Sequence, residues 1–124
     1  MEFQKDNTFL TGRLKSIGFA LKGAIKLMGT EHSIMVQTSV GVLLFIAGFY
    51  FEISSTEWMF QILALGLVLS IEGLNTAIEK IADFIHPNYH EKIGFIKDIA
   101  AGSVFFAAMT AISLVLIIYI PKLL

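Results

Sequence analysis

The sequence predicts an all-α membrane protein, with three spanning helices and an N-terminal helix at the membrane interface. Apolar residues make up 56% of the 124-residue chain, and the mean hydropathy is +0.76, both above the usual range of soluble domains. Three apolar runs, at about residues 34–52, 58–81 and 98–120, approach or exceed the roughly 20 residues that a helix needs to cross the hydrocarbon core. We therefore treat residues 1–124 as one membrane-embedded domain.

The segment before the first span predicts an amphipathic helix over about residues 12–29. Its apolar residues recur at helical spacing, namely Leu14, Ile17, Leu21, Ala24, Ile25 and Met28. Its polar positions include Arg13, Lys15, Lys22 and Lys26. Because a helix with one apolar and one basic face lies flat in the membrane interface, we expect this helix to lie there.

Basic residues predict the orientation of the spans. Eight of the nine Lys and Arg residues precede the first span or surround the second connection, namely Lys5, Arg13, Lys15, Lys22, Lys26, Lys80, Lys92 and Lys97. These regions are predicted to be cytoplasmic, because Lys and Arg are enriched on that side. The first connection, around Glu52 to Glu57, has no basic residue, and we expect it to face outward together with the C-terminus.

The second connection is predicted to run from Asp83 to Lys97. It contains His86, Pro87 and Asn88, and proline with asparagine favours a turn where the second span ends. Of the predicted loops, it is the only one long and polar enough to hold chemistry.

Composition also excludes several classes of function. The chain has no cysteine, which excludes disulfides, iron–sulfur clusters, thiolate metal sites and a cysteine nucleophile. Its net charge is −1 and its basic residues are dispersed, so nucleic acid is not an expected partner.

Four polar residues of the second span share one helix face. Glu72, Asn75, Glu79 and Asp83 follow the spacing i, i+3, i+7 and i+11. A charged side chain at mid-span costs about 2.5–3.5 kcal/mol on insertion scales, and such residues usually mark a functional site. Glu72 is the most informative of the four, because it lies deepest in the apolar run.

This acidic face has more than one possible use. Two carboxylates can bind a hard divalent cation, and Lys97 can neutralise phosphate oxygens, which favours phosphate chemistry. The same residues could instead line an ion pathway or fix contacts between helices, as in an ion-conducting or structural membrane oligomer. The sequence has no GxxxxGK[ST] phosphate loop and no protein-kinase glycine loop.

A specific motif runs in order through the second and third spans. It comprises Glu72-Gly73-Leu74-Asn75-Thr76-Ala77-Ile78-Glu79-Lys80, then Asp83, Tyr89-His90-Glu91 and Lys97-Asp98-Ile99-Ala100-Ala101-Gly102. This motif resembles the E-x-x-N-[ST]-A-I-E … D … [YF]-H … K-D-x-[AG] pattern of the prokaryotic diacylglycerol and undecaprenol kinases. The N-terminal helix and Glu31 fit the same family, so that the resemblance covers nearly the whole chain.

The resemblance implies a role for each matching residue. Glu72 corresponds to the carboxylate proposed as general base for the lipid hydroxyl. Glu31 and Glu79 correspond to the pair that coordinates Mg²⁺ with the phosphates of ATP. The other residues implied at the nucleotide site are Asn75, Lys97 and Asp98, the loop residues His86, Pro87 and Asn88, and, from the N-terminal helix, Arg13 and Phe19. Phe19 stands where the family has a tyrosine, so only its ring contacts can transfer.

The resemblance also implies the reaction, the assembly and the location. We expect MgATP-dependent phosphorylation of a membrane lipid alcohol by a homotrimer with sites between protomers, in the bacterial cytoplasmic membrane. The N-terminus is predicted to be inside and the C-terminus outside. Either diacylglycerol or undecaprenol could be the lipid, although Ala100-Ala101-Gly102 resembles the undecaprenol kinase branch more closely.

Overall fold

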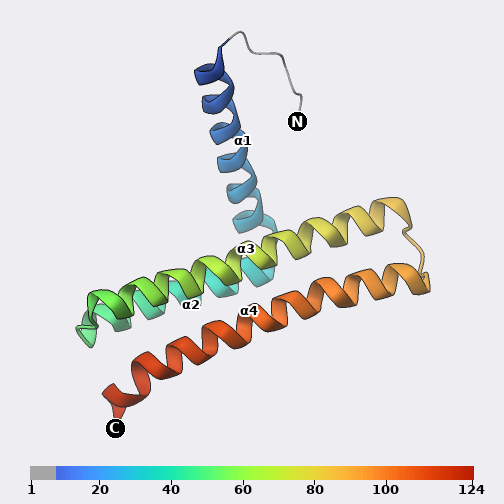
Figure 1. The fold of residues 1–124 in the computed structure, drawn as a ribbon. Helices are drawn as coiled ribbons and strands as arrows, with labels where there is room; N and C mark the ends of the chain where they lie inside the picture. Colours follow the sequence, from blue (N-terminus) through green and yellow to red (C-terminus); the bar gives the residue numbers. More distant parts are fainter. Residues whose placement is uncertain (1–7) are drawn as a thin grey trace. The chain divides into compact units, whose positions relative to one another are not determined.

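The computed structural model describes residues 8–124, so that Lys5, used above for orientation, lies outside the described part. Four helices follow one another along the chain, α1 (Phe9–Thr30), α2 (His32–Tyr50), α3 (Ser55–Ile85) and α4 (Glu91–Leu123) (Figure 1). The chain divides into two compact units, Met1–His32 and Ser33–Leu124. We describe each unit by itself.

The first unit contains α1, which is three residues longer at its N-terminus than predicted. Thr8 caps the helix, because its Oγ1 accepts a hydrogen bond from the backbone N–H of Thr11 at 3.2 Å. The helix ends at Thr30, since Glu31 has an extended backbone and its N–H closes the last turn on Leu27. The helix itself is confirmed, whereas its amphipathic character and its position in the membrane interface remain predictions.

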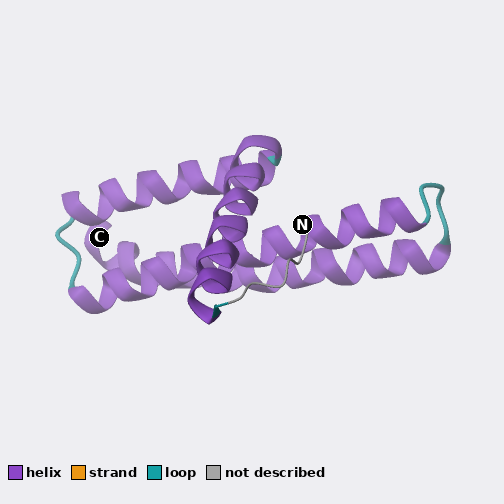
Figure 2. Cartoon of the chain, turned by 90° about the horizontal axis from the view of Figure 1, so that it is seen from above, coloured by secondary structure: helices purple, strands orange, loops and turns teal. Residues whose placement is uncertain are grey.

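The second unit consists of three helices that are each long and apolar enough to span a membrane. In Figure 1, α3 and α4 run beside each other in opposite directions and are farther apart toward the C-terminus, and α2 runs beside the first part of α3. Figure 2 gives a second view of these helices and of the short loops between them. Many large apolar side chains of these helices are exposed, including Leu63, Phe106 and Ile117. Such side chains need an apolar surrounding, which a lipid bilayer supplies. The prediction of three helices long and apolar enough to span a membrane is confirmed.

A tight turn joins α2 to α3. Ile53 N–H donates to the carbonyl of Gly48 at 3.1 Å, and Glu52 N–H donates to that of Phe49 at 3.3 Å, which together form a Schellman motif. Glu52 occupies its left-handed position, with φ of 51°, where glycine is more usual. The turn reverses the chain within four residues.

The second span begins earlier than predicted, because a capping box starts α3 at Ser55. Ser54 Oγ accepts from the N–H of Glu57 at 3.1 Å, and Glu57 Oε1 accepts from the N–H of Ser54 at 3.0 Å. Glu57 therefore belongs to the helix, and the predicted connection over residues 52–57 was too long.

The predicted second connection from Asp83 to Lys97 was wrong in its extent. Helix α3 continues to Ile85 and α4 starts at Glu91, which leaves residues 86–90 as the loop. Asp83 and Lys97 are helical, because a polar residue does not by itself end a helix. Helix α3 ends shortly before Pro87, which disfavours helical backbone at the preceding residue. The polar residues expected on a loop are therefore held largely on two rigid helices.

Helices α3 and α4 are longer than a bilayer requires. At 31 and 33 residues, they extend roughly 46 Å and 50 Å, against about 30 Å of hydrocarbon. Counted from Ser55, about 20 residues reach the region of Asn75. The remainder of the α3–α4 pair, up to the loop at 86–90, can therefore project beyond the hydrocarbon core.

Two glycines allow α2 to approach α3 closely. A Cβ atom at Gly41 would lie 2.8 Å from the side chain of Leu65, and one at Gly48 would lie 2.7 Å from the ring of Trp58. Near this contact, Ile53, Ile118 and Tyr119 form a cluster of buried apolar residues. This cluster lies at the end of the second unit nearest Ser54.

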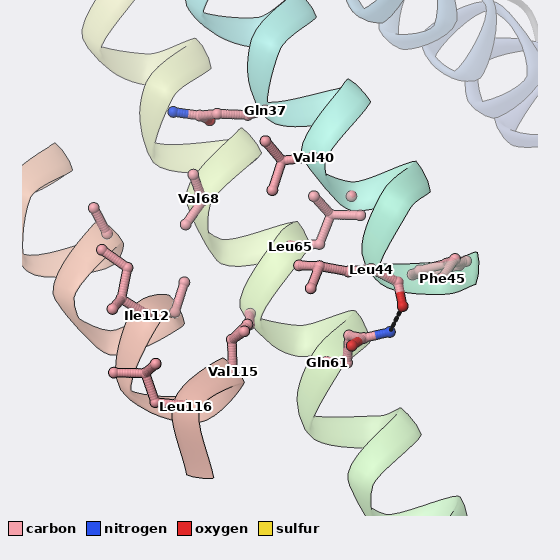
Figure 3. A pocket seen from close by; sticks show the side chains of 14 residues that line it. Gln37, Val40, Leu44, Phe45, Gln61, Leu65, Val68, Ile112, Val115 and Leu116 are labelled. Carbon is pink, nitrogen blue, oxygen red and sulfur yellow. Dashed lines mark hydrogen bonds between the residues drawn. The ribbon is translucent and has the colours of Figure 1, made fainter. Parts of the chain in front are cut away.

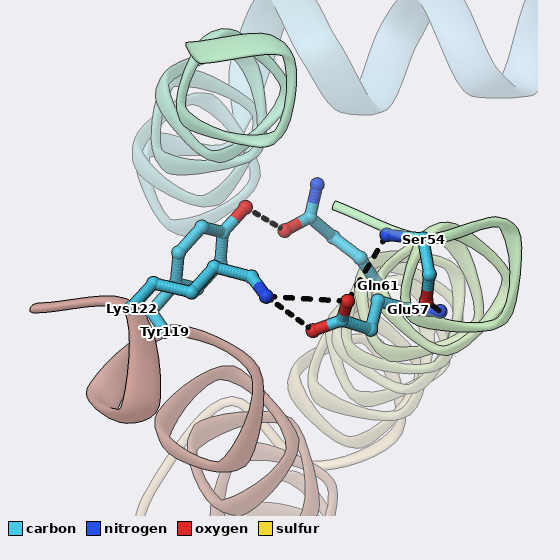
Figure 4. Close-up of polar contacts among 5 residues, drawn as sticks. All are labelled: Ser54, Glu57, Gln61, Tyr119 and Lys122. Carbon is cyan, nitrogen blue, oxygen red and sulfur yellow. Dashed lines mark hydrogen bonds and ion pairs between the residues drawn. The ribbon is translucent and has the colours of Figure 1, made fainter. Parts of the chain in front are cut away.

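A polar network at the same end connects all three helices, and Figure 4 shows the side chains of α3 and α4 that take part in it. The Tyr119 hydroxyl lies 2.5 Å from Gln61 Oε1, and Gln61 Nε2 donates to the carbonyl of Leu44 at 3.1 Å. Lys122 forms an ion pair with Glu57 at 3.1 Å. Tyr119 is only 8% exposed, and its hydroxyl hydrogen-bonds inside the bundle.

Candidate active site

An apolar cavity of about 310 Å³ lies between α2, α3 and α4 (Figure 3). Its walls are mostly aliphatic, and its two polar lining residues are Gln37 and Gln61, which stand toward opposite ends. Both the nitrogen and the oxygen of the Gln61 amide are hydrogen-bonded within the network near Ser54. Gln37, at the opposite end of the cavity, is hydrogen-bonded to Glu72.

Glu72 is the buried carboxylate of the second unit. It is 8% exposed, and Gln37 Nε2 donates to its Oε1 at 2.7 Å. This contact joins α2 to α3 where the apolar part of α3 gives way to its polar part. A carboxylate can be kept there because a hydrogen bond to a charged group is stronger than one between neutral groups.

Asn75 and Glu79 form the next polar contact along α3. Asn75 Nδ2 donates to Glu79 Oε1 at 3.3 Å, whereas Asn75 Oδ1 is buried with no hydrogen-bond partner among the described residues. Carbonyl and carboxylate oxygens are the ligands that Mg²⁺ prefers. A buried oxygen without a partner, beside an exposed carboxylate, is the kind of donor set that fits this cation.

Lys97 joins α4 to α3 through an ion pair with Asp83, at 2.6 Å. The Lys97 side chain is 37% exposed and that of Asp83 is 60% exposed, and exposed pairs contribute only about 0–1 kcal/mol to stability. An anion such as a phosphate could therefore share this ammonium at little cost. Asp98 is exposed on the same helix.

The loop residues form short-range contacts with one another. His86 Nδ1–H donates to the backbone oxygen of Asn88 at 2.6 Å, and Pro87 between them is exposed. His90 caps α4, because its Nδ1 accepts from the N–H of Lys92 at 3.0 Å. These contacts shape a compact loop that joins the ends of two long helices.

The remaining predicted residues lie in the first unit. The Arg13 guanidinium stands 5.2 Å from the centre of the Phe9 ring, and Phe19 is partly exposed farther along the same helix. Glu31 is the residue that ends α1. A metal site shared by Glu31 and Glu79 stays a prediction, and within residues 8–124 no three His, Asp or Glu side chains gather as a metal cluster.

Sequence reasoning missed Gln37, which contacts the predicted base directly. The available signal was a glutamine within an apolar span, one helix away from a buried glutamate. Spacing alone could not connect the two, because i, i+3 and i+4 rules relate residues of one helix only.

Fold and site together define a membrane-embedded helical protein with an oxygen-rich polar site suited to a cation or a phosphate. The model of the prokaryotic diacylglycerol kinase family matches residues 18–119. The chain therefore belongs to the prokaryotic diacylglycerol kinase family.

Relatives of known function agree with this family. The chain is 36% identical to the undecaprenol kinase of Bacillus subtilis over 109 residues, which cover 88% of this chain and 89% of that protein. It is 29% identical to the diacylglycerol kinase of Escherichia coli K12 over 108 residues, which cover 86% and 88%. The protein is a lipid kinase of this type, and a kinase takes its phosphoryl group from ATP. The alternative of an ion-conducting or structural protein is thereby set aside.

Proposed function

We propose that this protein transfers the γ-phosphoryl group of MgATP directly to the hydroxyl of a membrane lipid alcohol, with Glu72 as the general base. The observation that carries this proposal is a buried carboxylate one hydrogen bond away from an apolar cavity, on a helix that continues past it with further polar residues. A lipid alcohol and a nucleotide approach from these two sides.

In the proposed reaction, Glu72 takes the proton of the lipid hydroxyl. The lipid oxygen forms a bond to the γ-phosphorus as the bond from that phosphorus to the β–γ bridging oxygen breaks, and ADP leaves. Transfer of this kind depends mainly on positioning and charge neutralisation rather than on a covalent enzyme intermediate.

The nucleotide is proposed to bind along the projecting part of α3 and α4. Glu79, together with Glu31, would hold Mg²⁺, which when bound neutralises phosphate charge, and the free oxygen of Asn75 supports an oxygen-rich site there. Lys97 would neutralise phosphate oxygens. The other proposed contacts to ATP are those of Asp98, His86, Pro87, Asn88, Arg13 and Phe19.

Diacylglycerol and undecaprenol are the two candidate substrates. Each combines one hydroxyl with long apolar chains, which suits a site between an apolar cavity and a buried carboxylate. We favour undecaprenol, because the relative with 36% identity is named undecaprenol kinase and because Ala100-Ala101-Gly102 resembles that branch.

We further propose a homotrimer in the bacterial cytoplasmic membrane with sites between protomers, because three helices are too few to enclose both a lipid and ATP. An equal mixture of Glu31→Gln and Glu72→Gln chains tests this. If one site takes Glu31 from one protomer and Glu72 from another, about a quarter of the sites in mixed trimers contain both carboxylates, and activity returns. If both variants are inactive alone and the mixture is also inactive, sites between protomers are contradicted.

The experiment that tests the function is a lipid panel. The purified protein is given MgATP with undecaprenol, diacylglycerol or a long-chain primary alcohol in detergent micelles, and phosphorylated lipid and ADP are measured together. Equal amounts of the two products with at least one lipid alcohol are expected. ADP formation that does not depend on any lipid would count against the proposal.

A further inference from the structure

Gln37 is an amide group held within an apolar span. A carboxylate only accepts hydrogen bonds, so the amide nitrogen of Gln37, and not its oxygen, must face Glu72. The 2.7 Å contact from Nε2 to Glu72 Oε1 agrees with this orientation. The amide oxygen therefore points away from the carboxylate that the nitrogen contacts.

That amide oxygen is buried with no hydrogen-bond partner among the described residues. An unpaired buried acceptor is unfavourable and calls for an explanation. Gln61, the other glutamine of the cavity, provides the comparison, because both ends of its amide are hydrogen-bonded. The two glutamines thus differ in that Gln37 alone keeps an acceptor open.

The position of Gln37 relates this open acceptor to the substrate. Gln37 lines the apolar cavity, and Glu72 lies one hydrogen bond beyond it. A group that fills the cavity and carries a hydroxyl at its end therefore meets the amide on its way to the carboxylate. A hydroxyl hydrogen is what the open oxygen can accept.

We propose that Gln37 is a positioning residue for lipid phosphorylation, whose amide nitrogen fixes one oxygen of Glu72 and whose amide oxygen first accepts the hydroxyl hydrogen of the arriving lipid alcohol. The hydroxyl then turns its single hydrogen from Gln37 to the second oxygen of Glu72, which takes the proton as the lipid oxygen bonds to the γ-phosphorus. This inference rests on the proposed function, since it concerns how the substrate reaches the proposed base.

A purely structural role would look different. In that case Gln37 would only tie α2 to α3, and its removal would lower thermal stability while the folded enzyme kept its kinetic constants. A positioning role instead lowers kcat and raises the lipid KM, with the ATP KM unchanged.

Two variants of Gln37 separate these roles. Gln37→Met keeps the length and removes both polar groups, whereas Gln37→Asn keeps the amide and withdraws it by one methylene. The control is Ser39→Ala in the same helix, where the exposed hydroxyl bonds only to the carbonyl of Met35. Steady-state kinetics with undecaprenol or diacylglycerol, and thermal unfolding, are measured on the same preparations.

We expect kcat to fall roughly 10-fold or more in both Gln37 variants, as for loss of a hydrogen bond to a charged group. The lipid KM should rise, and Ser39→Ala should match the parent. If Gln37→Met does not fold, Gln37→Asn provides the same comparison. Parental kcat and lipid KM in a folded Gln37 variant would overturn this inference alone, whereas a parent that phosphorylates no lipid alcohol would overturn the proposed function and this inference together.

Discussion

At the scale of single residues, Glu72 offers the most direct test of the proposed chemistry. Glu72→Gln keeps the shape of the side chain and an oxygen that can still accept from Gln37, but it removes the basic group. We expect lipid phosphorylation to fall roughly 100-fold or more, within the range found for a positioned general base. Thermal stability should be unchanged or higher, because a neutral amide replaces a buried carboxylate.

The measurement is the phosphorylation rate, the ATP affinity and the melting temperature of one preparation. ATP affinity should persist, since Glu72 is not proposed to touch the nucleotide. Turnover close to the parental rate would eliminate the role of general base, whatever the stability of the variant.

Glu79 is predicted to act through the metal. Glu79→Gln replaces a charged oxygen ligand by a neutral one, so the Mg²⁺ concentration needed for half-maximal rate should rise about 10-fold or more, with turnover reduced at limiting Mg²⁺. The matched control is Glu52→Gln, an exposed carboxylate in the turn at the opposite end of α3. Full activity of Glu79→Gln at limiting Mg²⁺ would show that Glu79 is not a ligand.

The single-helix part of the site could be predicted from the sequence, and the contacts between helices could not. Helical spacing placed Asn75 next to Glu79, and the structure contains their hydrogen bond. The contacts of Glu72 with Gln37 and of Asp83 with Lys97 join different helices. They depend on the register between helices, which no periodicity within one helix determines.

At the scale of helices, the number of spans was predictable and their ends were not. Hydropathy identifies the apolar length of a helix, but α3 and α4 continue as helices after the sequence turns polar. The actual ends come from local hydrogen bonding, namely the capping box at Ser54, the cap at His90 and the stop before Pro87. The pattern Ser54-Ser55-Thr56-Glu57 was a readable signal for the first of these.

The polar network around Gln61 is predicted to stabilise the packing of all three helices. Tyr119→Phe removes the phenolic hydrogen and leaves Gln61 Oε1 buried without a donor. An unpaired buried acceptor in a water-soluble protein lowers the free energy of unfolding by about 1–3 kcal/mol. Hydrogen bonds between membrane helices contribute less, about 0.6 kcal/mol on average. We therefore expect a destabilisation of about 1 kcal/mol or less, with kcat unchanged.

Thermal or denaturant unfolding in detergent measures this effect. Tyr50→Phe is the matched control, because Tyr50 lies at the same end of the bundle and is 79% exposed. Equal stability of the two variants would show that the network does not hold the helices together.

At the scale of the whole molecule, the second unit has two unlike ends. The end near Ser54 contains the apolar cluster of Ile53, Ile118 and Tyr119 and the ion pair of Lys122 with Glu57, and both features contribute to the packing of the helices. The part of α3 and α4 that continues toward residues 86–90 contains Asn75, Glu79, Asp83 and Lys97. The apolar cluster and the ion pair at one end are thus separated along the helices from the residues of the proposed chemistry.

The same asymmetry leads to a prediction about membrane topology. The 3.1 Å ion pair places the C-terminal turn of α4 beside the first turn of α3, and the loop at 86–90 lies roughly 46 Å away along α3. Because the chain has no cysteine, single cysteines can report each end. Suitable exposed positions are Ser55 and Leu124 at one end and Tyr89 at the other.

In intact cells, a membrane-impermeant maleimide should label Ser55→Cys and Leu124→Cys, and it should label Tyr89→Cys only after permeabilisation. Ser55 is preferred to Ser54, because Ser54 caps α3 and its loss would disturb the helix. The result separates two claims. Labelling of Ser55→Cys and Leu124→Cys from opposite sides would contradict the helical arrangement itself. If Tyr89→Cys is labelled in intact cells and Ser55→Cys and Leu124→Cys only after permeabilisation, the helical arrangement is kept. Only the predicted orientation, which rests on the distribution of basic residues, would then be reversed.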